Sequence, residues 1–133
     1  MTKAIFTTIL LMAGLTTAHA SYAIEGTWGT QQSQNNIVFD MTFSIHNNTL
    51  TVTNDCTMNG QSATARVTSA ATYTDSTFTI LAAAPDQESN PTQTVNCNVS
   101  VQPDTMNYSV NGNQLIFTHD GSDQSFALER KGN

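Results

Sequence analysis

The sequence predicts an all-β protein of about eight antiparallel strands, folded as a barrel or as a β-sandwich. Apolar and polar residues alternate with a period of two through most of the chain after residue 20, as in strands with one buried face. Turn signals such as Asn59-Gly60 and Asn111-Gly112 separate these runs at spacings typical of barrels and sandwiches. No helix of useful length is expected.

The alternation is clearest between residues 37 and 45, where the apolar residues occupy every odd position. Residues 84–93 contain two prolines and form the one long loop that we expect. The runs expected to form strands, including a short piece at 106–110, cover residues 24–30, 37–45, 50–56, 63–68, 78–80, 95–101, 106–110, 115–118 and 126–130.

The first twenty residues have the pattern of a secretory signal peptide. Lys3 supplies the positive charge, residues 4–15 the apolar region, and residues 18–20 (Ala-His-Ala) a cleavage site after Ala20. The apolar region is shorter than the roughly 20 residues that span a bilayer. We therefore expect a secreted or periplasmic protein without a membrane anchor, in which residues 21–133 form a single domain.

Basic residues are scarce, and the formal net charge is −6. After the leader, the Lys and Arg residues are Arg66, Arg130 and Lys131. Such a chain cannot build the basic surface that a phosphate backbone requires, so nucleic acid is not an expected partner. Anionic membrane surfaces are disfavoured for the same reason.

Two cysteines in an exported chain predict a disulfide, Cys56–Cys97. Both share their parity with apolar neighbours, so both side chains should face inward. Their strands, the third and the sixth, would not be neighbours in a simple meander, whereas a disulfide requires Cα atoms about 4.4–6.8 Å apart. Either the bond lies at the end of a barrel, or the fold is a sandwich that brings the two strands together.

The first strand carries Gly26-Thr27-Trp28, with the only tryptophan, and the last strand carries Arg130. This pair resembles the lipocalins and related small barrels, in which a G-x-W on the first strand is matched by an arginine near the end of the chain. The resemblance implies an up-and-down barrel, with Trp28 closing one end and Arg130 packed across its ring. Both residues share their parity with apolar neighbours, so both are expected to face inward.

A lipocalin-like barrel binds a ligand only if its interior is hollow. The small residues Ala63 and Ala65 leave space opposite Phe39, Met41 and Phe43, and these five are the expected ligand-lining residues. Eight-stranded barrels are either filled by side chains or hold one small ligand, and both remain open here. No inward pair of basic residues is available for a carboxylate, so the expected ligand is small and mostly apolar.

Nothing in the sequence points to catalysis, a metal or a cofactor. His46 and His119 lie at predicted turns, and no motif of a nucleophile, a zinc site or a phosphate loop accompanies them. Asp120 and Asp123 flank a glycine but lack the spacing of a calcium loop. We expect a non-enzymatic binding protein. The alternative is a protein-interaction or inhibitor module that acts through surface loops such as 84–93.

Overall fold

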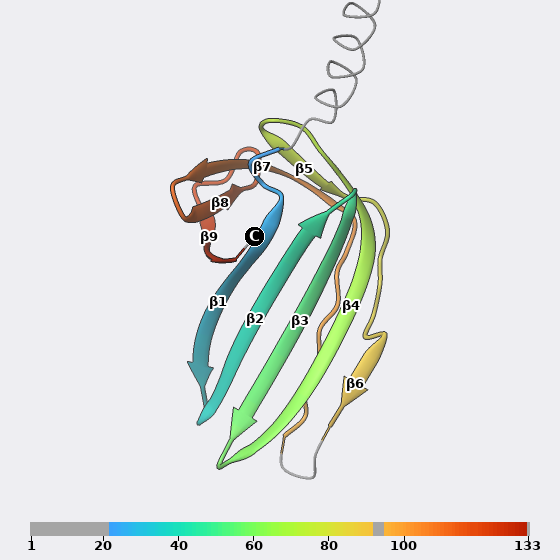
Figure 1. The fold of residues 1–133 in the computed structure, drawn as a ribbon, viewed down its shortest axis with the longest axis vertical. Helices are drawn as coiled ribbons and strands as arrows, with labels where there is room; N and C mark the ends of the chain where they lie inside the picture. The colour runs from blue at the N-terminus through green and yellow to red at the C-terminus, as the bar shows by residue number, and fades with distance from the viewer. Residues whose placement is uncertain (1–21, 92–94, 133) are drawn as a thin grey trace, which may run out of the picture.

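The computed structural model describes residues 22–91 and 95–132, so the predicted signal peptide lies outside the described residues. These residues form β-strands, turns and extended segments, with no helix (Figure 1). The strands are β1 (Gly26–Gln34), β2 (Ile37–His46), β3 (Thr49–Met58), β4 (Gln61–Tyr73), β5 (Thr77–Ile80), β6 (Glu88–Asn90), β7 (Asp104–Asn111), β8 (Gln114–Thr118) and β9 (Ser125–Gly132).

Eight of the nine strands close into an antiparallel barrel. Their order is β3-β2-β1-β9-β8-β7-β5-β4, and a further ladder between β3 and β4 completes the ring. Strands that are neighbours in the ring follow one another along the chain, apart from the short excursion through β6 and the pairing of β1 with β9 that joins the two ends of the chain. The predicted eight-stranded antiparallel barrel is therefore confirmed, and the sandwich alternative is wrong.

Asparagine pairs form two of the hairpin turns. Asn35 and Asn36 have φ values of 54° and 67°, and Asn47 and Asn48 have φ values of 51° and 58°. Positive φ at both central residues gives the type I′ turn, whose twist matches that of the flanking strands, and asparagine tolerates this region better than most residues. The predicted turn at Asn59-Gly60 has the same signs of φ. These turns set the register of the four longest strands.

The closed ring occupies only one end of the four longest strands. β1 pairs with β9 near its start, over Thr27–Gly29, and β4 pairs with β5 only over Ala71–Tyr73. Beyond these points β1 to β4 continue together as a curved sheet (Figure 1). β6 pairs with the middle of β4, next to residues 64–66. The barrel is thus complete at one end and lacks part of its wall at the other.

The predicted strand at 95–101 is not a strand of the barrel. It is extended but makes only one isolated bridge, between Val101 and Ala84. Figure 1 shows it running behind the sheet of β1 to β4. Val95, Cys97 and Val99 are buried, whereas the residues between them are exposed. The alternation correctly predicted an extended segment with one buried face, but this face covers the concave side of the sheet instead of joining it. We call residues 95–101 the covering segment.

The covering segment explains the disulfide. Cys56 of β3 is bonded to Cys97, with their Cα atoms 5.9 Å apart. No two strands on opposite sides of the barrel have to approach each other, because Cys97 belongs to a segment that lies against the concave face of the sheet. Neither a sandwich nor a pairing of two barrel strands is required.

The predicted long loop at 84–93 is also more ordered than expected. Ala84 is bridged to Val101, and residues 88–90 form β6. The Asp86 carboxylate accepts a hydrogen bond from the backbone N–H of Val99, and the Gln87 side chain accepts one from Thr68 N at 2.7 Å. Residues 92–94 of this predicted loop lie outside the described residues. The described part is tied to the sheet and to the covering segment.

Candidate ligand-binding site

The inward face of β2 carries a row of half-buried apolar side chains. Phe39, Met41 and Phe43, three of the residues predicted to line a ligand site, belong to this row and pack against the buried core. Their ladder partners on β3 have the same inward parity and are all buried: Cys56, Asn54 and Val52. The row is therefore apolar, inward-facing and only partly covered.

The two predicted alanines lie in a different part of the interior. Ala63 and Ala65 of β4 have 1% and 0% of their surface exposed. Ala63 is the ladder partner of Cys56, and Cys56 is bonded to Cys97 of the covering segment. The small side chains leave room for this segment on the side of β3 and β4. Their role as ligand contacts stays a prediction, as does that of the half-buried row on β2.

An open pocket lies among residues of β7, β8, β9 and the connection between β8 and β9. Its volume is about 250 Å³, and its lining residues are Met106, Phe117, His119, Gln124, Ser125 and Phe126. Phe126 is 41% exposed, although it shares the inward parity of Leu128. A large inward-facing aromatic residue with this exposure marks the place where the wall of the barrel is incomplete.

Aromatic contacts join the pocket to the row on β2. The ring of Phe126 lies 6.0 Å from that of Phe43 and 6.2 Å from that of Phe117, measured between centroids. Such distances are typical of favourable aromatic pairs. The pocket and the row therefore form one apolar surface, which we call the channel: Phe39, Met41, Phe43, Met106, Phe117 and Phe126.

The pocket lies beside the part of β9 that does not pair with β1. Their pairing ends at Gly29 and Glu129, after which β1 continues with β2 while β9 continues with β8. Phe126 lies at the start of β9, on the part that no longer pairs with β1. The parity that predicts an inward-facing Arg130 also places Phe126 inward, but no sequence pattern predicted the pocket. The available signal was an apolar residue of inward parity at the very start of the last strand.

Polar groups surround one side of the pocket. His119 Nε2 lies 2.6 Å from Asp104 Oδ2, and both side chains are exposed to solvent. Gln124 and Ser125 complete this polar side. The pocket therefore has an apolar side and a polar side. Among the described residues there is no group of three or more His, Cys, Asp or Glu side chains that could hold a metal ion.

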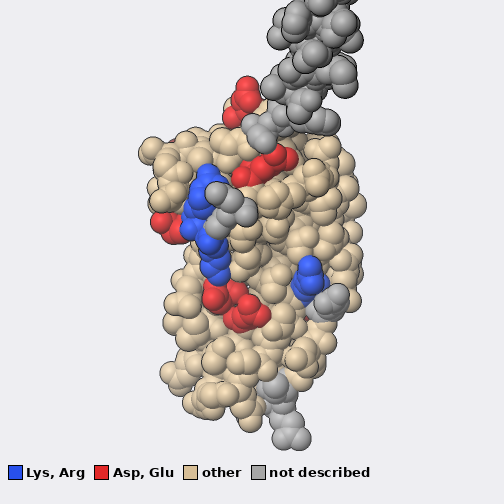
Figure 2. Space-filling view, viewed as in Figure 1, with Lys and Arg blue, Asp and Glu red and all other residues tan. Residues whose placement is uncertain are grey.

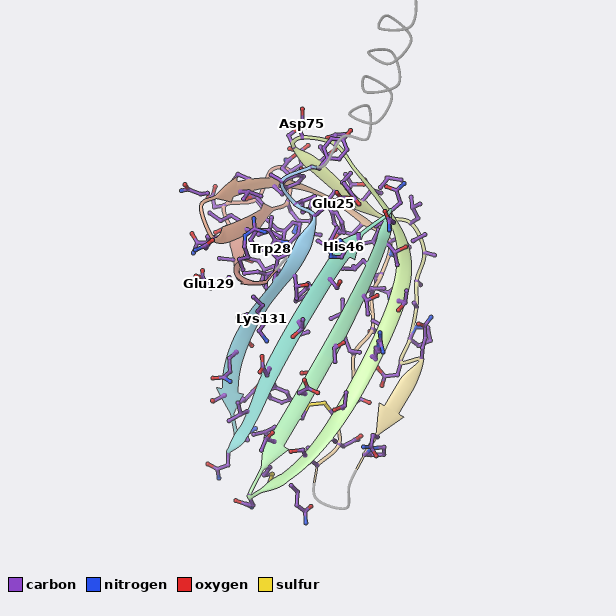
Figure 3. All side chains as sticks on the ribbon, in the orientation of Figure 1. Glu25, Trp28, His46, Asp75, Glu129 and Lys131 are labelled. Carbon is purple, nitrogen blue, oxygen red and sulfur yellow. A yellow bond between two sulfur atoms is a disulfide. The ribbon has the colours of Figure 1, made fainter. Side chains whose placement is uncertain are left out.

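Trp28 and Arg130 pack against each other where β1 pairs with β9. The Trp28 side chain is fully buried, and its Nε1 donates a hydrogen bond to Ile24 O at 2.8 Å. Arg130 Cζ lies 4.2 Å from the centroid of the Trp28 ring, a distance typical of a cation–π contact. Figure 3 shows Trp28 near the closed end of the molecule, among the side chains that fill it. This pair is part of the structural framework and does not line the pocket.

A polar cluster adds to the closure of this end. The Tyr73 hydroxyl donates to Glu25 Oε2 at 2.6 Å and accepts a hydrogen bond from Asn48 N at 3.1 Å. Burial raises the pKa of Tyr73, and its hydrogen bond to Glu25 raises it further. The Tyr108 pKa is raised as well, first by burial and then by the negative charge of Asp75. Because these tyrosines stay neutral over the ordinary pH range, they can be buried at this end of the barrel without removing a charge from water.

Charged side chains are sparse on the face that the long strands present (Figure 2). The outward-facing Asp40 on β2 is paired with Lys131, whose Nζ lies 2.9 Å from Asp40 Oδ1. No helix within residues 22–91 and 95–132 is long and apolar enough to cross a membrane.

Fold and site together define a small all-β protein: a closed eight-stranded antiparallel barrel with one disulfide and an open pocket lined by residues of β7 to β9. This architecture is compatible with a lipocalin-like fold. No protein-family model, no curated protein and no solved structure matches the chain.

Proposed function

We propose that this chain is an exported, lipocalin-like binding protein for a small, mostly apolar ligand, which enters through the opening between β1 and β9. The observation that carries the proposal is the exposure of Phe126, which is 41% exposed although it is inward-facing and in contact with Phe43 and Phe117. An apolar ligand in this channel would remove aromatic surface from water, which contributes about 25 cal/mol per Å². The predicted signal peptide and the disulfide support export.

The charge of the channel supports a neutral ligand. Its six residues are all uncharged, and the polar contact at the pocket wall, between His119 Nε2 and Asp104 Oδ2, is exposed to solvent. A carboxylate or an ammonium group would lose its hydration in the channel without gaining a partner of opposite charge. We therefore propose neutral apolar molecules as the ligand class.

A titration with an environment-sensitive lipophilic dye tests the proposal. Trp28 is the only tryptophan and is the ladder partner of Phe43 on the neighbouring strand. Energy transfer from Trp28 to a dye in the channel should therefore accompany saturable binding. Absence of saturable binding would contradict the proposed function.

Two matched substitutions locate the site. Phe126 and Leu81 are the two large apolar side chains that are exposed among the described residues, at 41% and 52%. Phe126→Ser should weaken dye binding about tenfold or more, because it removes a large apolar contact from the channel. Leu81→Ser removes an exposed apolar side chain that does not line the pocket, and should leave binding unchanged. Equal effects of both substitutions would place the dye elsewhere.

A further inference from the structure

The concave face of the sheet contains one polar side chain whose hydrogen bonding is incomplete. Asn54 of β3 is 6% exposed, and its Nδ2 donates to Asn98 O of the covering segment at 3.0 Å. Its Oδ1 is buried and has no hydrogen-bond partner among the described residues. The other buried polar residue, Ser69, donates its hydroxyl hydrogen to a backbone oxygen. Buried hydrogen-bond acceptors are normally paired, so an unpaired Oδ1 at this position is unusual.

Asn54 is next to the channel. Its ladder partner on β2 is Met41, one of the half-buried channel residues. Phe43 lies two residues further along β2, which is about 7 Å of strand, and contacts Phe126 of the pocket. Directly opposed side chains on one face have Cβ atoms about 4.5–5.5 Å apart. Met41, an unbranched and adaptable side chain, is therefore the channel residue directly opposite Asn54.

We propose that the channel selects apolar ligands that carry one neutral hydrogen-bond donor, such as a hydroxyl group, and that Asn54 Oδ1 accepts this hydrogen bond. This inference rests on the proposed function and adds the chemical feature that the site recognises. The ligand displaces the Met41 side chain and places its donor at the inner end of the channel. Because Asn54 Nδ2 is already bonded to Asn98 O, the side chain is held in an orientation that leaves Oδ1 available.

The surrounding charges favour a hydroxyl over an ammonium group. The carboxylates on β2 and β3, Asp40 and Asp55, have the opposite parity to Met41 and Asn54 and therefore face outward. A buried ammonium would have no carboxylate partner on the inner faces of these strands. A ligand that can only accept hydrogen bonds, such as an ether, would leave Oδ1 unpaired.

A displacement experiment with two matched ligands tests this selection. The dye is bound to the wild-type protein and then displaced by 1-decanol or by its methyl ether, which has the same chain but no donor. We expect the alcohol-to-ether affinity ratio to be roughly tenfold higher in the wild type than in Asn54→Leu, which has a similar volume and no acceptor. Comparing the two ratios cancels the difference in hydrophobicity between the ligands.

A control separates recognition from loosening of the covering segment. Asn54→Leu also removes the hydrogen bond to Asn98 O, whereas Asp86→Ala removes a different bond to the same segment, the one from Val99 N, and leaves Asn54 intact. Asp86→Ala should keep the wild-type ratio. If it loses the preference to the same extent as Asn54→Leu, the assignment to Asn54 is overturned.

A measurement on the wild type covers the case in which Asn54→Leu does not fold. The side-chain amide resonances of Asn54 should shift on addition of the alcohol and not on addition of the ether. Unshifted resonances at saturating alcohol would overturn the proposal. If the dye itself does not bind, the proposed function fails and this inference fails with it. If the dye binds but the ratio is the same in wild type and Asn54→Leu, only the role of Asn54 is refuted.

Discussion

The side chain of Lys131 on β9 crosses the backbone of Gly29 on β1 and pairs with Asp40 on β2. It therefore links β9 to β2 across the strand between them. Lys131 Nζ lies 2.9 Å from Asp40 Oδ1 and 3.1 Å from Thr42 Oγ1. A Cβ atom on Gly29 would lie 2.5 Å from Lys131 Cε and 3.0 Å from Met41 O. The pairing of β1 with β9 ends at this glycine. The contact thus lies at the point where the two strands separate.

Gly29→Ala should therefore destabilise the fold by about 1 kcal/mol. The added methyl group forces the Lys131 side chain away from Asp40, and an exposed ion pair of this kind contributes about 0.2–1 kcal/mol. Urea unfolding of Gly29→Ala, Lys131→Ala and the double variant measures the coupling. The cost of Gly29→Ala should be smaller in the Lys131→Ala background; an equal cost in both would mean that the contact with Met41 O dominates.

Removing the disulfide should lower the melting temperature substantially. The two cysteines are 41 residues apart, and closing a loop of this size stabilises the fold by about 4 kcal/mol on the chain-entropy model. The double substitution Cys56→Ala, Cys97→Ala should therefore melt more than about ten degrees lower, at ~4–8 °C per kcal/mol for a small domain. Non-reducing mass spectrometry of the wild-type protein provides the reference, because a mass two protons higher would mean free thiols. An unchanged melting point would mean that the covering segment stays in place without the bond.

Arg130→Met should destabilise the closed end by about 1 kcal/mol. The substitution keeps an unbranched apolar side chain over Trp28 but removes the cation–π contact, which contributes about 0.5–2 kcal/mol. Arg130→Lys retains the positive charge and is the matched variant, so it should lose less. Urea unfolding followed by the emission of Trp28 reports both stability and the environment of the ring. Equal stability of wild type and Arg130→Met would assign the role of Arg130 to packing alone.

Stability should fall as the pH rises above about 10. The pKa values of Tyr73 and Tyr108 are raised in the folded protein above the ordinary value of 10.0. The unfolded chain therefore loses these protons first, so the stabilisation is fully present below pH 10 and is lost as the pH rises through the folded pKa values. Tyr73→Phe should make the decline shallower and, by removing the hydrogen bond to Glu25, should cost about 1 kcal/mol at neutral pH. A decline of the same steepness in wild type and Tyr73→Phe would contradict the assignment to Tyr73.

Local patterns in the sequence were enough to predict the strands and the direction of their side chains. Phe39, Met41 and Phe43 face inward because successive side chains of a strand alternate between its two faces, and this holds whatever the strand pairs with. The turns at Asn47-Asn48 and Asn59-Gly60 are also local, because positive φ is accessible to these residue types. The closure of the barrel, in contrast, was predicted from the resemblance carried by Trp28 and Arg130.

Tertiary structure decided what each inward face meets. Residues 95–101 have the alternation of a barrel strand, but the ring closes without them, so their buried face covers the sheet instead. Alternation indicates that one face of a segment is buried, but it does not indicate which strand the backbone pairs with. For the same reason, Ala63 lies under the covering segment whereas Phe126 lines an open pocket. This difference depends on where β1 and β9 stop pairing, a contact between the two ends of the chain that no local pattern specifies.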